Sequence, residues 1–509
     1  MISIGFDIGS SSIKCSLWDL SKNSVVATGH YPAQEMEILS PFPGWAEQHP
    51  ELWWEYLVLL TRKLLSESGI RGDDVGAIGI AYQMHGLVAV DASGTVLRPA
   101  IIWCDSRAVE IGENAFRKLG KEFCLSHLLN SPGNFTASKL RWMKEHEPEI
   151  YHRIHKIMLP GDYVAMKLTG EISTTVGGLS EGIFWDYTRG SVSSELLDFY
   201  EIDKDLLPEV RPTFSVQGRL SPPAASQLGL PAGIPIAYRA GDQPNNAFSL
   251  NVLKPGEIAA TAGTSGVVYA VTDSLVHDPF SRINVFTHVN YTKEAVRLGI
   301  LLCINGTGIL NSWLRRNVTP GLGYDEMNAL ASKSPAGSRG LLLFPFGNGA
   351  ERMLSNATVG SHLAGLDFNR HGTSDVLRAG QEGIAFSFRY GVDILRDLGV
   401  TINVVRAGKS NLFLSPLFSQ TLATVLGASI ELYDTDGAQG AARGAALGSG
   451  MYHAESEAFD SLEKKAVIHP DSGEGAHLTD VYQHWCSGLK NLLNNRDGGV
   501  NVSGEGEIS

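Results

Sequence analysis

Two short turns rich in glycine, serine and threonine constrain the fold of this chain more than any other feature. Residues 5–19 and residues 258–269 each read as an apolar strand, a small-residue turn and a second strand. The glycines that open the two turns, Gly9 and Gly263, lie 254 positions apart in a chain of 509 residues. This spacing predicts a duplicated architecture with one hairpin in each half. The turn residues of segment 248–256 place the boundary between the halves there.

The residue types of these turns indicate the ligand that they can hold. Glycine allows the backbone to approach a phosphate closely, while serine and threonine supply hydroxyl and N–H donors. Asp7 stands just before the first turn, where its carboxylate could bind the water shell of Mg²⁺ but could not favourably touch a bare phosphate. The alternative is a tight hairpin in which Asp7 caps the turn, but two matched turns favour phosphate binding.

The charge of the chain limits its partners. The formal net charge is −13, which repels nucleic-acid backbones and anionic lipid surfaces and so disfavours nucleic-acid and membrane roles. Any anionic ligand must therefore be held by local devices such as backbone amides, helix N-termini or a metal ion. We expect a cytoplasmic protein with reduced thiols, because the five cysteines form no framework pattern and no apolar run approaches the length of a membrane span.

Strand-like apolar runs alternate with amphipathic helical stretches along the chain, which predicts an α/β fold. Trp53 and Trp54 fall in a predicted helix that runs to Leu65, where their spacing fits core packing and not carbohydrate stacking. Residues 496–509 are mostly glycine, asparagine, serine and glutamate, which indicates a flexible tail.

Asp242 is the candidate catalytic residue. It follows a predicted strand and glycine turn at residues 235–241 and precedes a helix start with Pro244 in its first turn. An ordinary N-cap is the alternative role for an aspartate in this position. The two roles are hard to combine, because a carboxylate turned back to its own helix is not free to accept a proton.

The chain resembles the FGGY carbohydrate kinases, which are relatives of hexokinase, actin and the heat-shock chaperone ATPases. Six segments carry the resemblance in the family's order: residues 6–14, 44–50, 83–88, 103–107, 241–243 and 261–266. The resemblance implies two actin-like (ribonuclease H-like) ATPase domains around a central cleft, with residues 1–247 as the first and 248–495 as the second. It also implies that ATP with Mg²⁺ binds between the two hairpins and that the γ-phosphoryl group passes to a sugar hydroxyl.

The resemblance assigns roles to individual residues. Asp242 would be the general base that accepts the proton of the attacking hydroxyl, Gln243 would contact the sugar, and Asp7 would hold Mg²⁺ through water. The residues matched to ATP or phosphate binding in the two hairpins are Asp7, Gly9, Ser10, Ser11, Ser12, Lys14, Gly263, Thr264 and Ser265.

Met84 and His85 indicate the substrate, because segment 83–86 resembles the xylulokinase members of the family. In those members the matching residues lie at the sugar, which favours D-xylulose. Without the resemblance, His85 would be interpreted as a satisfied histidine after a strand. The alternatives are a kinase of another sugar, polyol or sugar acid (L-fuculose, L-ribulose, gluconate or glycerol) and a non-transferring actin-like ATPase or sugar sensor. A homodimer is common among these relatives.

Two segments depart from the family pattern. At residues 405–413 Arg406 and Ala407 replace two glycines of the usual adenosine turn, while Gly408 and Asn411 remain predicted nucleotide contacts. The alternative there is a plain strand-to-helix turn capped by Ser410 or Asn411. At residues 131–139 the inserted Asn134 interrupts the pattern Gly-Phe-Thr-x-x-Lys on the sugar side.

Overall fold

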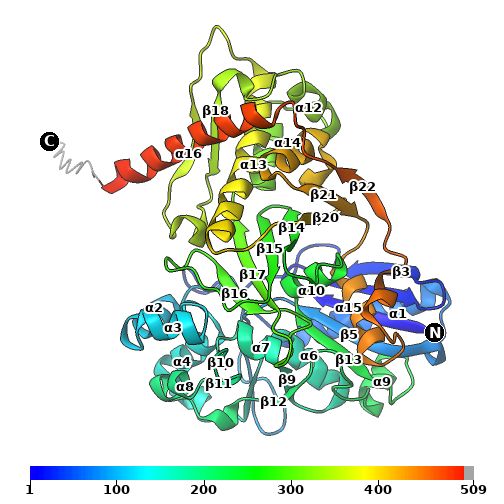
Figure 1. The fold of residues 1–509 in the computed structure, drawn as a ribbon. Helices are drawn as coiled ribbons and strands as arrows, with labels where there is room; N and C mark the ends of the chain where they lie inside the picture. Colours follow the sequence, from blue (N-terminus) through cyan, green and yellow to red (C-terminus); the bar gives the residue numbers. More distant parts are fainter. Residues whose placement is uncertain (498–509) are drawn as a thin grey trace, which may run out of the picture. The chain divides into compact units, whose positions relative to one another are not determined.

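The computed structural model describes residues 1–497, which form an α/β protein (Figure 1). The predicted tail, residues 496–509, lies outside the described residues apart from its first two positions, which end the helix α16 (Gly475–Asp497). Compact packing divides the chain into two units. Unit 1 comprises Met1–Ala259, Tyr269–Leu301 and Tyr433–Lys464, and unit 2 comprises Ala260–Val268, Leu302–Leu432 and the described residues from Lys465 onward. Each unit is built from three segments of the chain. The predicted division into domains 1–247 and 248–495 therefore stays a prediction.

The first sheet has five strands in the order β13-β5-β1-β2-β3. Strand β1 pairs antiparallel with β2 and parallel with β5, and β13 adds parallel to β5. The bounds of these strands are β1 (Ile2–Ile8), β2 (Ile13–Asp19), β3 (Ser24–Tyr31), β5 (Val75–Tyr82) and β13 (Ile236–Gly241). All seven residues of β1 are buried, which is expected of a central strand covered on both faces.

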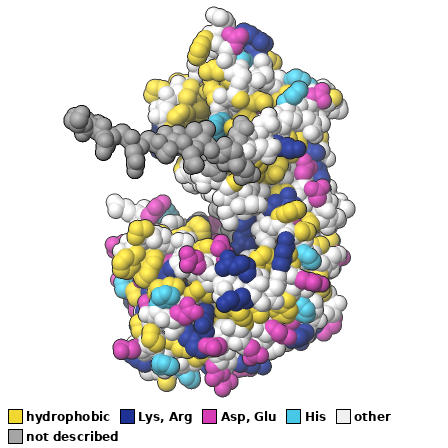
Figure 2. Space-filling model, turned by 90° about the vertical axis from the view of Figure 1, so that its left-hand side faces the viewer, with side chains coloured by type: hydrophobic (Ala, Val, Ile, Leu, Met, Phe, Trp, Pro, Cys, Tyr) yellow, Lys and Arg dark blue, Asp and Glu magenta, His cyan; other side chains and the backbone are white. Residues whose placement is uncertain are grey.

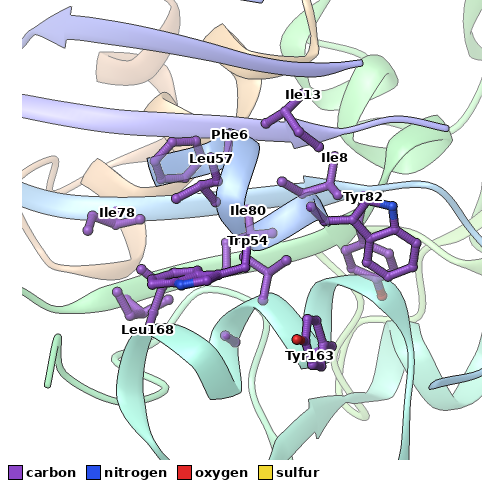
Figure 3. Close-up of a cluster of buried hydrophobic side chains, with 14 of the residues drawn as sticks. Phe6, Ile8, Ile13, Trp54, Leu57, Ile78, Ile80, Tyr82, Tyr163 and Leu168 are labelled. Carbon is purple, nitrogen blue, oxygen red and sulfur yellow. The ribbon is translucent and has the colours of Figure 1, made fainter. Parts of the chain in front are cut away.

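Helix α1 (Pro50–Ser68) packs on one face of this sheet and α15 (Gly437–Gly448) on the other (Figure 1). Trp53 and Trp54 of α1 are buried in the core, as predicted. Figure 3 shows this core, in which Trp54 and Leu57 lie among isoleucines of the strands. The helix begins with Pro50 in its first turn and ends at Gly69, whose φ of 69° provides the left-handed cap.

The second sheet has seven strands in the order β16-β17-β15-β14-β20-β21-β22. Its β14–β15 hairpin holds the second small-residue turn, so both predicted strand-turn-strand motifs form. The bounds are β14 (Glu257–Ala262), β15 (Gly266–Thr272), β16 (Asn284–Thr287), β17 (Leu298–Ile304), β20 (Val404–Gly408), β21 (Ser429–Tyr433) and β22 (Lys464–Ile468).

The remaining strands form two-stranded pairs. These are β4 (Glu47–Gln48) with β7 (Ala100–Ile101), β6 (Val88–Val90) with β8 (Lys156–Met158), β9 (Ser173–Thr175) with β12 (Glu209–Arg211), β10 (Trp185–Asp186) with β11 (Ser191–Val192), and β18 (Leu342–Phe346) with β19 (Gly360–Ala364).

Besides α1 and α15, nine helices belong to unit 1, and unit 2 holds five among the described residues. Those of unit 1 are α2 (Val109–Lys118), α3 (Lys121–His127), α4 (Thr136–His146), α5 (Pro148–Tyr151), α6 (Pro160–Thr169), α7 (Val176–Glu181), α8 (Ser194–Tyr200), α9 (Pro222–Leu228) and α10 (Asp242–Ser249). Those of unit 2 are α11 (Gly308–Asn317), α12 (Tyr324–Ala331), α13 (Thr373–Asp397), α14 (Pro416–Leu426) and α16.

The surface of the described residues is mixed in character. On the face drawn in Figure 2, acidic, basic and hydrophobic side chains are interspersed. Among the described helices, none combines the length and the apolar character needed to cross a bilayer. All five cysteines are free thiols, and Cys15 and Cys124 are buried as small core residues, as the sequence predicts.

Candidate active site

The first hairpin places its turn at residues 9–12, between β1 and β2. The amide of Gly9 donates to the Ser12 carbonyl over 3.1 Å, which closes the turn. The carbonyls of Ser10 and Ser11 accept hydrogen bonds from the Gln48 side chain and the Met36 amide. These carbonyls are thereby tied to the protein, which suits a turn that presents donors to an anion.

Asp7 and Lys14 face each other across the hairpin, because they are paired in the antiparallel register. The Lys14 Nζ lies 3.5 Å from the Asp7 Oδ2. Burial raises the pKa of Asp7, although Lys14 offsets part of the effect. The charge of Asp7, with smaller contributions from Asp436 and Asp242, raises the pKa of Lys14. Three acidic residues therefore contribute to the electrostatic environment of Lys14, and Asp7 is the one in contact with it.

Asp242 is the first residue of α10, and the N-cap position belongs to Gly241. The interpretation of Asp242 as an ordinary N-cap is therefore wrong. Its pKa is raised to about 7, first by burial and then by the charge of Asp7, while hydrogen bonds from the backbone and side chain of Gln243 lower it. The side chains of Asp242 and Gln243 are both partly exposed to solvent. A carboxylate with a pKa near neutrality, still reachable from outside, is suited to accept a proton.

Met84 and His85 follow β5. This loop lies beside Gly241, the last residue of β13, which Asp242 follows directly. A Cβ atom on Gly241 would lie 2.7 Å from the Met84 Cγ and 2.9 Å from a carboxyl oxygen of Glu181. Glycine is required here because these two side chains pack directly over its Cα. The structure thus brings the predicted sugar residue Met84 beside the predicted base Asp242.

The ring of His85 is held on several sides. Its Nδ1 lies 2.9 Å from the backbone carbonyl of Glu181 in α7, and the rings of Phe135 and Phe286 lie 4.8 Å and 5.1 Å away. Since a carbonyl can only accept, Nδ1 carries the proton. The contact with the Glu181 carbonyl and the two aromatic rings fix the orientation of the His85 ring.

Glu181 is a feature that sequence reasoning missed. It is 1% exposed, and burial raises its pKa well above the ordinary value, although the Tyr82 hydroxyl and the His85 backbone offset part of that effect. It lines a small cavity with Met84, Gly241 and Arg239. Its position at the end of a short glycine-containing helix offers no recognisable signal in the sequence.

Unit 2 contains a cavity of about 560 Å³, which is within the range of small-molecule and cofactor sites. The predicted nucleotide residues Gly263, Thr264 and Asn411 line it, while the predicted Ser265 and Gly408 do not. Its other polar lining residues are Asn311, Ser312, Arg316, Tyr324, Asp325, Asn328 and Ser415. Ser265 instead donates its hydroxyl hydrogen to the Asn305 side chain over 3.3 Å.

The atypical segment 405–413 is a strand followed by a short 3₁₀ turn. Ser410 occupies the N-cap position of this 3₁₀ turn but makes no capping bond with its side chain, and α14 is capped by Ser415, which accepts from the Phe418 amide. A side-chain cap by Ser410 or Asn411 is therefore not formed. Asn411 adopts a left-handed φ of 52°, and a Cβ atom on Gly263 would lie 3.7 Å from its Nδ2. The second hairpin and Asn411 are thereby neighbours.

The two residues that replace family glycines have local structural roles. The guanidinium of Arg406 pairs with the Glu431 carboxylate on the adjacent strand, with 3.0 Å between Nε and Oε2. Ala407 is fully buried in β20. Both side chains are therefore accommodated within the sheet, one by an ion pair and one by burial.

Comparison with known proteins identifies the family. A model of the N-terminal domain of the FGGY family of carbohydrate kinases matches residues 2–249, and a model of the C-terminal domain matches residues 258–452. The chain belongs to the FGGY family of carbohydrate kinases. It is therefore an enzyme that phosphorylates a carbohydrate, and the family implies the use of ATP.

Full-length relatives of this FGGY kinase carry similar names. The chain is 28% identical over 453 residues to the xylulose kinase of Escherichia coli, covering 87% of this chain and 88% of the relative. It is 27% identical over 504 residues to the xylulose kinase of Bacillus subtilis, covering 96% and 97%. The crystal structure of xylulose kinase from Rhodospirillum rubrum superposes with a TM-score of 0.87 at 27% identity, covering 97% and 99%. The predicted two-domain actin-like fold is confirmed.

Part of the polar lining of the cavity in unit 2 could have been predicted from the sequence. Asn305-Gly-Thr-Gly308 is a third small-residue turn, placed between β17 and the helix α11 that supplies Asn311, Ser312 and Arg316. Gly306 has a φ of 86°, and a Cβ atom there would lie 1.6 Å from the Pro345 carbonyl oxygen. The strand-turn-helix pattern could therefore have located this part of the cavity.

Proposed function

We propose that this enzyme transfers the γ-phosphoryl group of ATP to a hydroxyl of D-xylulose, giving D-xylulose 5-phosphate and ADP. The observation that carries the proposal is the pairing of Asp242, a carboxylate with a pKa of about 7, with the sugar residues Met84 and His85 at the same end of the first sheet. The names and full-length similarity of the relatives support D-xylulose as the substrate.

In the proposed reaction the Asp242 carboxylate accepts the proton of the attacking sugar hydroxyl. The hydroxyl oxygen forms a bond to the γ-phosphorus while the bond from that phosphorus to the β,γ-bridging oxygen breaks, and ADP leaves with the electron pair. Because phosphoryl transfer depends on positioning and charge neutralisation, the chain has to orient the sugar and supply a proton acceptor. We assign the orienting role to His85, Met84 and Gln243.

The residues of the first hairpin fit a divalent cation that arrives with the nucleotide. Asp7, Asp436 and Asp242 all act on Lys14 electrostatically, yet no group of three or more metal-ligating side chains stands together among the described residues. We therefore propose that Asp7 contacts Mg²⁺ through water. Bound Mg²⁺ would neutralise charge on the β- and γ-phosphates.

We assign nucleotide binding to the residues predicted for it. In unit 1 the amides of Ser10, Ser11 and Ser12 and the Lys14 side chain would contact phosphate oxygens, and Gly9 would allow their close approach. In unit 2 Gly263, Thr264 and Asn411 line the cavity that we assign to the nucleoside. Ser265 and Gly408, which do not line it, stay predictions as contacts of the phosphate and of the adenosine.

A coupled assay of ADP release tests the function. The panel is ATP and Mg²⁺ with D-xylulose, D-ribulose, L-xylulose, L-fuculose, L-ribulose, D-gluconate, glycerol or water alone. We expect D-xylulose to lead by at least about tenfold in kcat/KM. Another leading sugar would refute the substrate, and release that no sugar accelerates above water would favour the non-transferring ATPase. The homodimer and the cytoplasmic location stay predictions, and sedimentation velocity tests the first.

A further inference from the structure

Lys139 is a buried lysine that contacts the sugar side of the enzyme. It lies in α4, is 0% exposed, and its Nζ donates to two backbone carbonyls, those of His85 and Ile102, each over 2.9 Å. One carbonyl belongs to the loop that follows β5, and the other stands directly after β7. A single side chain therefore joins the loop before β6 to the loop after β7.

The loop held by Lys139 has an unfavourable backbone conformation. His85 has a φ of 61°, in the left-handed region that a residue with a Cβ atom adopts at a cost. Such a conformation persists only where surrounding contacts enforce it. The hydrogen bond from Lys139 to the carbonyl of the same residue is such a contact.

The beginning of α4 contacts this loop at three successive points. The Phe135 ring, just before the helix, packs edge-on against the His85 ring. The Thr136 hydroxyl donates to the Gly86 carbonyl over 3.4 Å, and Lys139 holds the carbonyl of His85 itself. One short segment thus contacts the ring, the backbone and the next residue of the predicted sugar ligand.

Burying an ammonium group is costly, so its presence calls for a compensating role. Burial lowers the pKa of Lys139 to about 7, and the charge of Asp105 offsets part of that effect. Asp105 is itself engaged by the Arg107 guanidinium and the Ala46 amide. An apolar side chain of similar length would fill the same volume without this cost, but it would leave two buried carbonyls without their donor.

We propose that Lys139 is a positioning residue for the sugar, which holds His85 in its left-handed conformation and so aims the imidazole at the substrate. The proposal rests on the proposed role of His85 as a sugar ligand. Lys139 acts through His85 and does not touch the reacting atoms. Loss of Lys139 should therefore weaken the use of the sugar and leave the nucleotide site intact.

A double-variant cycle on the full chain tests this coupling. We expect Lys139→Met to lower kcat/KM for D-xylulose about 10- to 100-fold, mainly through KM, with the affinity for ADP unchanged. If Lys139 acts through His85, then adding it to His85→Ala should lower kcat/KM by less than about threefold more. Effects that multiply, or an equal loss of ADP affinity, would overturn the proposal.

Lys156 offers a matched control, because its Nζ also donates to two backbone carbonyls, those of Asp205 and Leu207. Lys156→Met should leave KM for the sugar within about twofold of the parent. A comparable rise in KM would show a general effect of removing such a lysine and would refute the proposal. If Lys139→Met does not fold, Lys139→Gln, which keeps an amide donor, enters the same cycle with the same criteria.

The design separates this proposal from the substrate assignment. The cycle is measured with whichever sugar leads the panel, so a wrong sugar refutes the proposed substrate while the coupling between Lys139 and His85 is still tested. If no sugar is phosphorylated, binding of D-xylulose to the four proteins of the cycle is measured by calorimetry. Affinities that change independently there would likewise refute the coupling.

Discussion

At the scale of single residues, two carboxyl groups near the proposed sugar site have pKa values that burial raises. Asp242 and Glu181 both lie close to Met84, and burial raises the pKa of each. They differ in access, since Asp242 is partly exposed and Glu181 is 1% exposed. A reachable group can exchange a proton with a substrate more readily than a buried one, which favours Asp242 over Glu181 as the proposed base.

Replacing Asp242 by asparagine should abolish sugar phosphorylation. The amide keeps the size of the side chain but cannot accept the hydroxyl proton, and a general base contributes on the order of 10²–10⁴-fold to rate. We expect kcat to fall by at least about 10³-fold in the coupled assay, with ADP affinity by calorimetry nearly unchanged. A variant with near-normal turnover would remove Asp242 from the mechanism.

The pKa of Asp242 also predicts a pH dependence. A base has to be ionised, so kcat/KM should fall about tenfold per pH unit below a midpoint near 7. The free energy of unfolding changes with pH in the opposite direction to kcat/KM. Asp242 binds its proton more tightly in the folded chain than in the unfolded chain, where its pKa is the ordinary 3.8. The contribution of Asp242 to stability therefore declines as pH rises from about 4 to about 7.

Thermal unfolding of Asp242→Asn beside the parent checks this sign. The asparagine does not titrate, so the variant should gain Tm relative to the parent at pH 8 compared with pH 4. A difference in Tm that does not change with pH, together with a flat rate profile between pH 6 and 8, would show that the pKa of Asp242 is close to its ordinary value.

At the scale of elements, the close packing of α15 on the first sheet decides how the site is built. Gly5 in β1 and Gly79 in β5 face this helix, and a Cβ atom on them would lie 1.9 Å and 2.1 Å from the carbonyl oxygens of Ala438 and Ala441. The same packing brings Asp436, the N-cap of α15, close enough to Lys14 to raise its pKa. A small-residue helix is required because a larger side chain would separate the two layers.

Gly5→Ala should therefore be strongly destabilising. The added methyl group meets backbone atoms, which cannot rotate away, so we expect a loss of about 3 kcal/mol or more in the free energy of unfolding. Denaturant unfolding of the two proteins measures it. Gly475→Ala is the control, since no atom lies within 4 Å of the Cβ it would add and alanine is favoured in a helix. Equal stability of Gly5→Ala and Gly475→Ala would contradict the packing described here.

At the scale of the whole molecule, the predicted ligand residues fall into separate units. The sugar residues and Asp242 belong to unit 1, and the cavity lined by Gly263 and Asn411 belongs to unit 2. An enzyme divided in this way should show separable effects of substitution on its two substrates. The kinetic constants for ATP and for the sugar are the corresponding measurements.

Asn411→Ala should raise KM for ATP by about 3- to 30-fold and leave KM for the sugar within about twofold. The expected size corresponds to one or two lost hydrogen bonds of about 1 kcal/mol each. His85→Ala should show the reverse pattern. Initial rates with each substrate varied in turn provide the four constants, and a rise of both KM values in Asn411→Ala would place this residue elsewhere in the mechanism.

The local parts of this protein were predictable from its sequence. The two hairpins, the buried tryptophans of α1 and the position of Asp242 at a helix start follow from hydrophobic periodicity and turn chemistry, which act over a few residues. The resemblance of six ordered segments then predicted the family. What each residue does locally was less certain, since the N-cap role of Asp242 proved wrong and no side-chain cap by Ser410 or Asn411 is formed.

Only the tertiary structure decided which distant residues meet. Helix α15 packs on β1, although the two are more than 400 residues apart in sequence. Lys139 donates a hydrogen bond to the His85 carbonyl, and the Glu181 carboxyl group packs against Gly241. No local pattern encodes such contacts, because they depend on how layers pack and on which carbonyls the packing leaves to be satisfied. The pKa of Asp242 belongs to the same class, since burial and the charge of Asp7 set it. The sequence by itself determined the elements and the residue types of the site, and packing determined their neighbours and their protonation.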